Sequence, residues 1–299
     1  MSVRETLRPE TVRQLENIQL RARRVVEGFL TGLHKSPYHG FSAEFAQHRQ
    51  YHPGDSMRAI DWKAYGRSDK LVVKEFQEET NLRTTIFLDC SGSMKFSSPA
   101  ANGVTKFQYA SDLAGALAFL MIHQRDAVGL VRCDTEIRES IPPRSLNSHL
   151  NVLLTSLENA EPGGETELGP QLHRVAEMIH RRGLVILISD LFDDPDAVLK
   201  GLAHFRHNGH EVLVFHILDP WELSFAFPKD GRFIDLETGE EILTRPRHVA
   251  GDVKRGVGDF FHKLQFEALA RGIEIVQITT DIPYDTALLR YLARRSRLL

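Results

Sequence analysis

The chain has 299 residues, of which 42% are hydrophobic and 26% are charged, and its formal net charge is -3 at pH 7. This length predicts about two domains, and the charge balance gives no overall basic field, so nothing in it indicates nucleic acid as the main partner. The most apolar run, residues 184–188, is far shorter than the roughly 20 residues of a membrane-spanning helix. The charged start, MSVRETLRPE, is unlike a signal peptide. We therefore expect a soluble, cytoplasmic protein.

The first part of the chain predicts a helix and then a small module of strands. Over residues 10–33, apolar residues recur at three- and four-residue spacing, which is typical of one buried helix face. Over residues 36–80 the segments are short, β-like and interrupted by the turn Pro53-Gly54-Asp55. We therefore predict a first unit over residues 1–80, made of a helix and a small β-rich module.

From residue 84 onward, strands and helices alternate. The predicted strands are 84–89, 127–133, 136–141, 184–190, 211–218 and 273–280, and the predicted helices are 106–124, 145–159, 167–182, 195–209, 253–272 and 283–299. All the strands except the third are nearly continuous apolar runs, as expected when helices cover both faces of a sheet. The sequence therefore predicts a doubly wound, mostly parallel six-stranded α/β sheet over residues 81–299, with a hairpin insertion near 222–250. We expect the common strand order 3-2-1-4-5-6.

Oxygen-bearing side chains gather in this predicted fold where the strand order reverses. Asp89 ends the first strand and Asp190 ends the fourth, and ligands of such sheets bind outside the carboxyl ends of the strands at this point. Ser91 and Ser93 follow the first strand, and Thr166 belongs to a third, glycine-containing loop. Two carboxylates and three hydroxyls suit a hard divalent ion such as Mg²⁺. An open position on that ion would attract an acidic side chain of a partner protein.

The same residues carry a resemblance to a known family. The D-x-S-x-S loop, with a threonine after a glycine pair and an aspartate after a strand, resembles the metal-ion-dependent adhesion site of von Willebrand factor A domains. In that family five side chains hold Mg²⁺ or Mn²⁺, some directly and some through water. The resemblance extends from residue 84 to about 299 and implies that the metal ligands here are Asp89, Ser91, Ser93, Thr166 and Asp190.

A second resemblance lies upstream, in FAQHRQYHPGDSMRAIDWKAYGRSDKLVVKEF. This stretch is similar to the signature of bacterial proteins of unknown function that are linked to MoxR-type AAA+ ATPases, in which the signature runs into a von Willebrand-like domain. The resemblance implies a protein partner, namely a MoxR-type ATPase or its client, with a role in protein remodelling or complex maturation. The sequence has neither a G-x-x-x-x-G-K-[ST] loop nor a G-x-G-x-x-G after a strand, so we expect the partner to bind the nucleotide.

Two other functions are compatible with part of the pattern. A Mg²⁺-dependent phosphatase or phosphotransferase of the haloacid dehalogenase type also has an aspartate at the end of its first strand. That chemistry needs a second acid two residues further on, where this chain has Ser91. A scaffold without metal would use Asp89 only to cap a loop. Because we find no catalytic constellation, we predict a metal-dependent protein–protein interaction module and not an enzyme.

Overall fold

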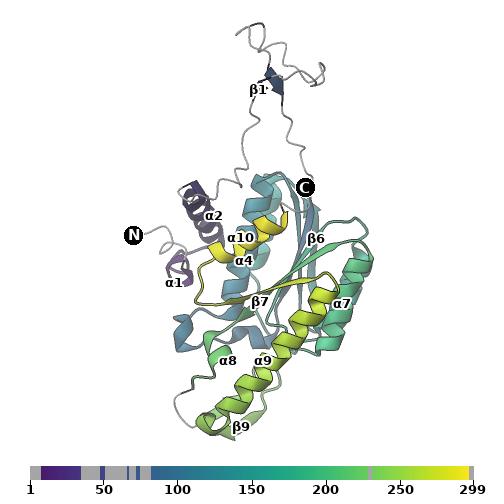
Figure 1. Cartoon of the computed structure of the whole chain (residues 1–299). Helices are drawn as coiled ribbons and strands as arrows, with labels where there is room; N and C mark the ends of the chain where they lie inside the picture. The colour runs from purple at the N-terminus through teal and green to yellow at the C-terminus, as the bar shows by residue number, and fades with distance from the viewer. Residues whose placement is uncertain are drawn as a thin grey trace.

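The centre of the molecule is a six-stranded sheet (Figure 1). The structure is a computed structural model that describes residues 8–34, 48–50, 66, 72–74, 82–227 and 231–295. The strands of the central sheet are β3 (Arg83–Asp89), β4 (Ala127–Cys133), β5 (Ile137–Arg144), β6 (Leu184–Ser189), β7 (Glu211–Leu218) and β10 (Glu274–Thr279). Their order across the sheet is β10-β7-β6-β3-β4-β5, which confirms the predicted order 3-2-1-4-5-6.

All neighbouring strands of this sheet run parallel, except that β5 runs antiparallel to β4. β5 lies at the edge of the sheet, and its residues alternate between half-buried and exposed. An edge strand tolerates proline because one side of its backbone needs no ladder partner. This is why β5 continues through Pro142 and Pro143 to Arg144, beyond its predicted end at residue 141.

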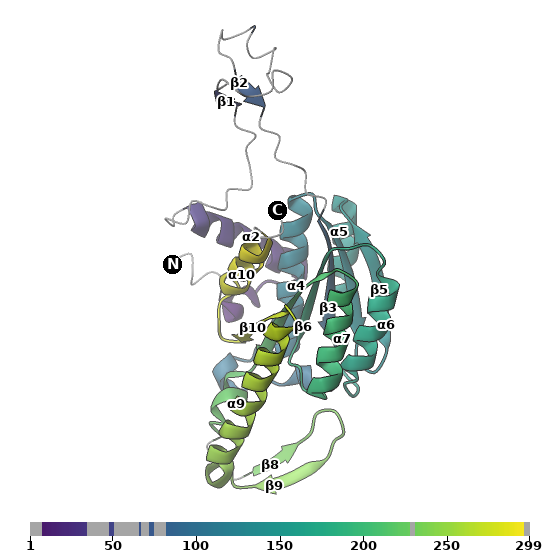
Figure 2. The same cartoon turned by 45° about the vertical axis from the view of Figure 1, so that its right-hand side comes forward.

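Helices cover both faces of the sheet, as the apolar strands predicted (Figure 2). Side chains alternate between the faces along each strand, so that Ile86 and Leu88 belong to one core and Phe87 to the other. On the side of Ile86 lie α2 (Ile18–His34), α4 (Lys106–His123), α5 (Asn147–Glu158) and α10 (Asp285–Arg295). On the side of Phe87 lie α6 (Leu168–Met178), α7 (Pro195–His207) and α9 (Pro246–Ala270).

The predicted helix over residues 10–33 is wrong as one continuous element. The structure has α1 (Pro9–Val12) and, after a break, α2. The side chain of Asn17 accepts a hydrogen bond from the Leu20 N–H at 2.9 Å, which is the pattern of an N-cap and starts a new helix there. The buried stripe of α2 packs in the same core as α4.

Two small pairs of strands complete the described chain. β1 (His48–Gln50) pairs antiparallel with β2 (Val72–Lys74), within the segments that predicted strands, while the rest of residues 36–80 apart from Gly66 lies outside the described residues. β8 (Gly231–Ile234) and β9 (Glu241–Thr244) form an antiparallel hairpin. The short helices are α8 (Pro220–Ser224), η3 (Gly92–Lys95) and η4 (Pro99–Ala101). None of the helices in the described ranges is both long and apolar enough to cross a membrane.

Candidate metal centre

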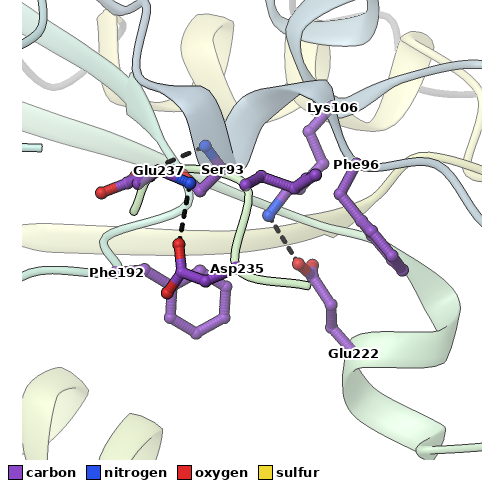
Figure 3. A pocket seen from close by; sticks show the side chains of 8 residues that line it. Ser93, Phe96, Lys106, Phe192, Glu222, Asp235 and Glu237 are labelled. Carbon is purple, nitrogen blue, oxygen red and sulfur yellow. Dashed lines mark hydrogen bonds and ion pairs between the residues drawn. The ribbon is translucent and has the colours of Figure 1, made fainter. Parts of the chain in front are cut away.

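A pocket of ≈ 360 Å³ opens beyond the carboxyl ends of β3 and β6 (Figure 3). Three parts of the chain line it: the loop after β3 with the start of α4, the segment after β6 with α8, and the tip of the β8–β9 hairpin. The lining residues are Ser93, Phe96, Lys106, Phe192, Glu222, Asp235, Leu236 and Glu237. Of the five predicted metal ligands, Ser93 lines this pocket, Asp89, Ser91 and Asp190 are buried, and Thr166 is half-buried.

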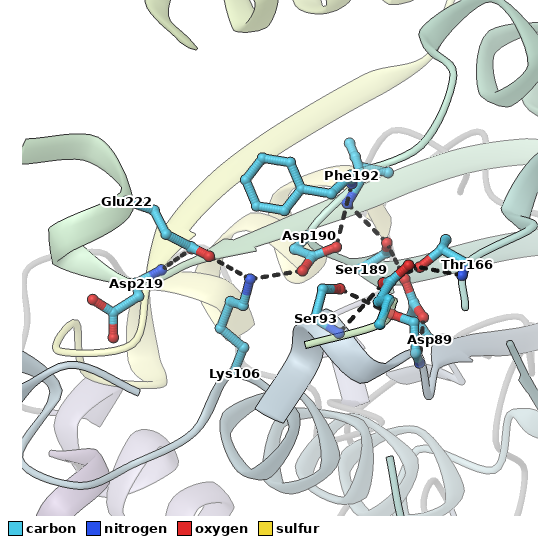
Figure 4. Close-up of polar contacts among 12 residues, drawn as sticks. Asp89, Ser93, Lys106, Thr166, Ser189, Asp190, Phe192, Asp219 and Glu222 are labelled. Carbon is cyan, nitrogen blue, oxygen red and sulfur yellow. Dashed lines mark hydrogen bonds and ion pairs between the residues drawn. The ribbon is translucent and has the colours of Figure 1, made fainter. Parts of the chain in front are cut away.

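Parallel pairing brings the two predicted aspartates together. β3 and β6 are neighbours in register, with Leu88 opposite Ile188, so Asp89 and Asp190 follow at the same edge of the sheet. Both side chains are buried. The carboxylate of Asp89 accepts a hydrogen bond from the Ser91 N–H at 2.9 Å and another from the Ser189 hydroxyl at 2.5 Å. Figure 4 shows the two aspartates beside Ser189.

The two serines lie in contact in the loop after β3. The hydroxyl oxygens of Ser91 and Ser93 are 3.1 Å apart. This loop is held to the glycine pair by two backbone hydrogen bonds, from the Gly92 N–H to the Gly164 carbonyl at 2.9 Å and from the Gly163 N–H to the Cys90 carbonyl at 2.8 Å. These bonds bring the chain that continues to Thr166 next to the serine loop.

Thr166 reaches the serine loop through a residue that sequence reasoning missed. The carboxylate of Glu237 accepts hydrogen bonds from the Thr166 hydroxyl at 2.5 Å and from the Thr166 N–H at 3.0 Å. The same carboxylate accepts the Ser93 N–H at 3.3 Å. The structure therefore gathers all five predicted residues at one edge of the sheet and adds Glu237 from the hairpin. A lone acid in a hairpin turn carries no local signal for such a contact.

Lys106, at the start of α4, was also missed. Its ammonium lies 2.7 Å from a carboxylate oxygen of Asp190 and 2.5 Å from one of Glu222. It also lies 4.9 Å from the centre of the Phe192 ring. The side chain of Lys106 is 1% exposed. A lysine that begins a mostly apolar helix was the available signal, because a buried lysine needs a partner charge.

The site holds more negative than positive charge. Burial and the neighbouring Asp190 raise the pKa of Asp89 to about 7. Burial also raises the pKa of Glu222. Burial opposes the charge of Lys106, but Asp190 and Glu222 outweigh it and raise the pKa of that ammonium. With Glu237, the site contains four carboxyl groups and one ammonium, and the ammonium contacts two of the four, Asp190 and Glu222.

A histidine supports Asp190 from behind. Burial lowers the pKa of His216 to about 4, which leaves its ring neutral near pH 7. The ring nitrogen Nε2 lies 2.9 Å from the backbone carbonyl of Asp190. Since a carbonyl only accepts, this nitrogen carries the proton and donates it. The contact fixes the backbone from which the Asp190 side chain projects.

The donor set fits a hard divalent cation. Hydroxyls and carboxylates are the oxygen ligands that Mg²⁺ and Mn²⁺ take, and a dication would offset the excess of negative charge. The Asp89 carboxylate accepts hydrogen bonds from Ser91 and Ser189, and these do not use all of its lone pairs. In the described part of the chain, no group of three His, Cys, Asp or Glu side chains is arranged to hold a metal ion. A metal here would therefore depend on the hydroxyls of Ser91, Ser93 and Thr166 as well.

The fold is similar to that of solved proteins. The crystal structure of the conserved hypothetical protein BatB from Bacteroides thetaiotaomicron matches 72% of this chain and 99% of that chain, with a TM-score of 0.50 and 16% identity. The VWA domain of SpRpn10 matches 71% of this chain and 95% of that chain, with a TM-score of 0.42 and 12% identity. The doubly wound sheet with its antiparallel edge strand is thus a von Willebrand factor A-like fold, as the sequence predicted.

The sequence also matches a family directly. Residues 47–250 match the family described as protein of unknown function DUF58, and the chain belongs to this family. Uncharacterized proteins of Mycobacterium tuberculosis and Mycobacterium bovis are 24% identical to it over 296 residues, which cover 97% of this chain and 91% of theirs.

Proposed function

We propose that this chain is a protein-interaction module that binds Mg²⁺ or Mn²⁺ through Asp89, Ser91, Ser93, Thr166 and Asp190 and so recognises an acidic side chain of its partner. The observation that carries the proposal is the convergence of these five side chains. They come from three loops far apart in the sequence and meet at the edge of the sheet where its strand order reverses. A simple loop cap would need only one of them.

Each group of residues has a separate task in this proposal. The hydroxyls of Ser91 and Ser93 offer neutral oxygens, which would add metal ligands without adding negative charge. Asp89 and Asp190 supply the anionic oxygens, and Lys106 keeps part of the Asp190 charge neutralised. When bound, the metal would supply a positive, electrophilic centre for a carboxylate of the partner. Binding through one such contact and a modest surrounding surface should be transient.

The partner that we propose is a MoxR-type AAA+ ATPase or its client. The support for it is the resemblance of the segment 45–76 to the signature of proteins linked to such ATPases. An ATPase partner would supply the energy for remodelling, and this chain would supply the contact. The two would meet in the cytoplasm, the location that the sequence predicts.

The test is co-purification of the full chain with the cognate ATPase in Mg²⁺, in chelator, and with the double variant Ser91→Ala, Ser93→Ala. Serine to alanine removes two hydroxyls and leaves the buried carboxylates in place, so the fold should persist. We expect retention of the ATPase in Mg²⁺ and loss of retention in the other two conditions. Equal retention in all three would show that the metal site does not mediate this contact.

The phosphatase alternative gains no support from the geometry of Asp89. A nucleophilic aspartate must reach the phosphorus atom of a substrate, but Asp89 is 1% exposed. Position 91, where the second acid of that chemistry would stand, carries a serine in contact with Ser93.

A further inference from the structure

The β8–β9 hairpin places a carboxylate of this chain on the residues that would hold the metal. Glu237 lies 144 positions from Ser93 and 71 positions from Thr166 in the sequence, yet it accepts hydrogen bonds from both. Both oxygens of the Glu237 carboxylate are used in these contacts. A solvated acid at a hairpin turn would make none of them, so the tip of the hairpin is directed at the site.

The turn that carries Glu237 is built to present it. The Asp235 carboxylate accepts the N–H of Glu237 at 2.7 Å and that of Thr238 at 3.0 Å, which holds the turn in a fixed shape. Gly239 has a φ of 75°, a conformation that glycine adopts without strain, and its N–H reaches the Asp235 carbonyl at 3.0 Å. The position of the Glu237 side chain is therefore set within the hairpin itself (Figure 3).

The hairpin tip and the serine loop approach each other so closely that only glycine fits between them. A Cβ atom at Gly92 would lie 2.6 Å from the Leu236 carbonyl oxygen and 3.0 Å from that of Gly164. Gly92 is the residue between the two serines of the D-x-S-x-S loop. The absence of a side chain there lets the backbone of the hairpin pass directly over the loop.

The hairpin is anchored by aromatic packing near its base and by the Glu237 contacts at its tip. The ring of Phe233 packs on those of Phe225 and Phe227, with ring centres 6.0 and 4.8 Å away. Toward the tip, Ile234 is 47% and Leu236 45% exposed. Moving the tip would thus uncover little additional apolar surface, and local opening of such a segment costs far less than global unfolding.

We infer that Glu237 is an internal occupant of the candidate site, so that the β8–β9 hairpin and an acidic side chain of a partner compete for the same position. This inference rests on the proposed function. A partner aspartate or glutamate offers the same carboxylate chemistry as Glu237. The internal carboxylate has the advantage of a high effective concentration, because the hairpin holds it in place. A partner must displace the tip before it can bind, which makes the resting site closed.

The first test measures the closed contact without metal. Hydrogen exchange of the Thr166 amide is followed in the full chain, in Glu237→Ala and in Glu240→Ala. Glu240 is an exposed acid of the same turn and serves as the matched control. Loss of a charge-assisted hydrogen bond should speed exchange at Thr166 by about tenfold in Glu237→Ala, and Glu240→Ala should exchange like the unaltered chain. Equal exchange rates in all three would overturn the inference.

The second test measures the competition. The chains are loaded with Mn²⁺ and titrated with a capped Gly-Glu-Gly peptide, while the water-proton relaxation of the bound ion reports displacement of its water. Removing the internal competitor should tighten peptide binding by about tenfold in Glu237→Ala, and Glu240→Ala should match the unaltered chain. Equal peptide affinity in the two variants would contradict the competition. If none of the chains binds Mn²⁺, both the proposed function and the competition are overturned. Faster exchange of the Thr166 amide in Glu237→Ala would in that case still establish the contact between Glu237 and Thr166.

Discussion

Lys106 determines how the charges of the candidate site are balanced. It is buried, and it bridges Asp190 on one side and Glu222 on the other (Figure 4). A buried ion pair contributes little net stability when it is intact, because desolvation offsets the attraction. Removing one partner is expensive, because a buried charge is then left alone. The lysine and a divalent metal would also share Asp190 as a partner.

Replacing Lys106 should therefore show how much of the stability of the site depends on this positive charge. In chelator, Lys106→Met should lower the free energy of unfolding by about 3–5 kcal/mol, since it leaves the buried carboxylate of Asp190 and the half-buried carboxylate of Glu222 without their ammonium. Lys95→Met, at an exposed position of the loop after β3, is the control and should change it little. Mg²⁺ should restore more stability to Lys106→Met than to the unaltered chain. Denaturant titration measures the free energy of unfolding of the unaltered chain and of both variants. An equal loss for Lys95→Met would refute the assigned role of Lys106.

At the scale of elements, α2 is fastened to α4 by a buried ion pair. The Arg21 guanidinium lies 2.6 Å from the Asp112 carboxylate, and Tyr284 of the segment before α10 donates to the same carboxylate at 3.3 Å. Burial raises the pKa of Asp112 to about 6, although Arg21 opposes this shift. One carboxyl group thus joins α2, α4 and the segment before α10.

The raised pKa of Asp112 determines how the free energy of unfolding should change with pH. Folded Asp112 holds its proton more tightly than the unfolded residue, whose pKa is about 4. Its contribution to stability is therefore present below about pH 4 and is lost as the pH rises through about 6. Between pH 4 and 7, the unaltered chain should lose up to about 3 kcal/mol relative to Asp112→Asn.

Urea unfolding of both chains across this pH range measures that difference. Asp252→Asn, at an exposed position, is the control and should run parallel to the unaltered chain. A constant difference between Asp112→Asn and the unaltered chain at every pH would show that Asp112 does not titrate in this way.

Most elements were predictable because their patterns are local. The apolar runs of β3, β6 and β7 can be recognised in short stretches of sequence, and so can the spacing of apolar residues within the helices. The break between α1 and α2 was missed, although Asn17 is a typical N-cap residue, because the apolar spacing on either side continues across it. The early start of α9 at Pro246 was missed as well, although proline favours the first turn of a helix.

At the scale of the whole molecule, the site was predictable as far as topology determines it. Parallel pairing of β3 and β6 fixes the neighbourhood of Asp89 and Asp190, and that pairing follows from the strand order. Glu237 and Lys106 could not be assigned to the site, because their contacts depend on how a hairpin and a helix end pack on that edge. Such packing is set by shape and not by a repeating pattern.

The proposed metal would bind to a chain that is already folded, and the fold would not depend on it. The sheet is covered by apolar helices on both faces, so chelator should leave the circular dichroism spectrum of the chain unchanged. A metal that binds only the folded chain adds about 2.7 kcal/mol at a hundred times its Kd. For a chain of this size that is a rise in Tm of roughly 5 °C.

The most direct measurement is therefore the Tm of the full chain in chelator and in saturating Mg²⁺, compared with the double variant Ser91→Ala, Ser93→Ala. Ser97→Ala is the matched control, because within the described residues the Ser97 hydroxyl has no hydrogen-bond partner. Mg²⁺ should raise the Tm of the unaltered chain and of Ser97→Ala, and the rise should vanish in the double variant. An equal rise in the double variant, or no rise in the unaltered chain, would contradict the assignment of this cluster as a metal site.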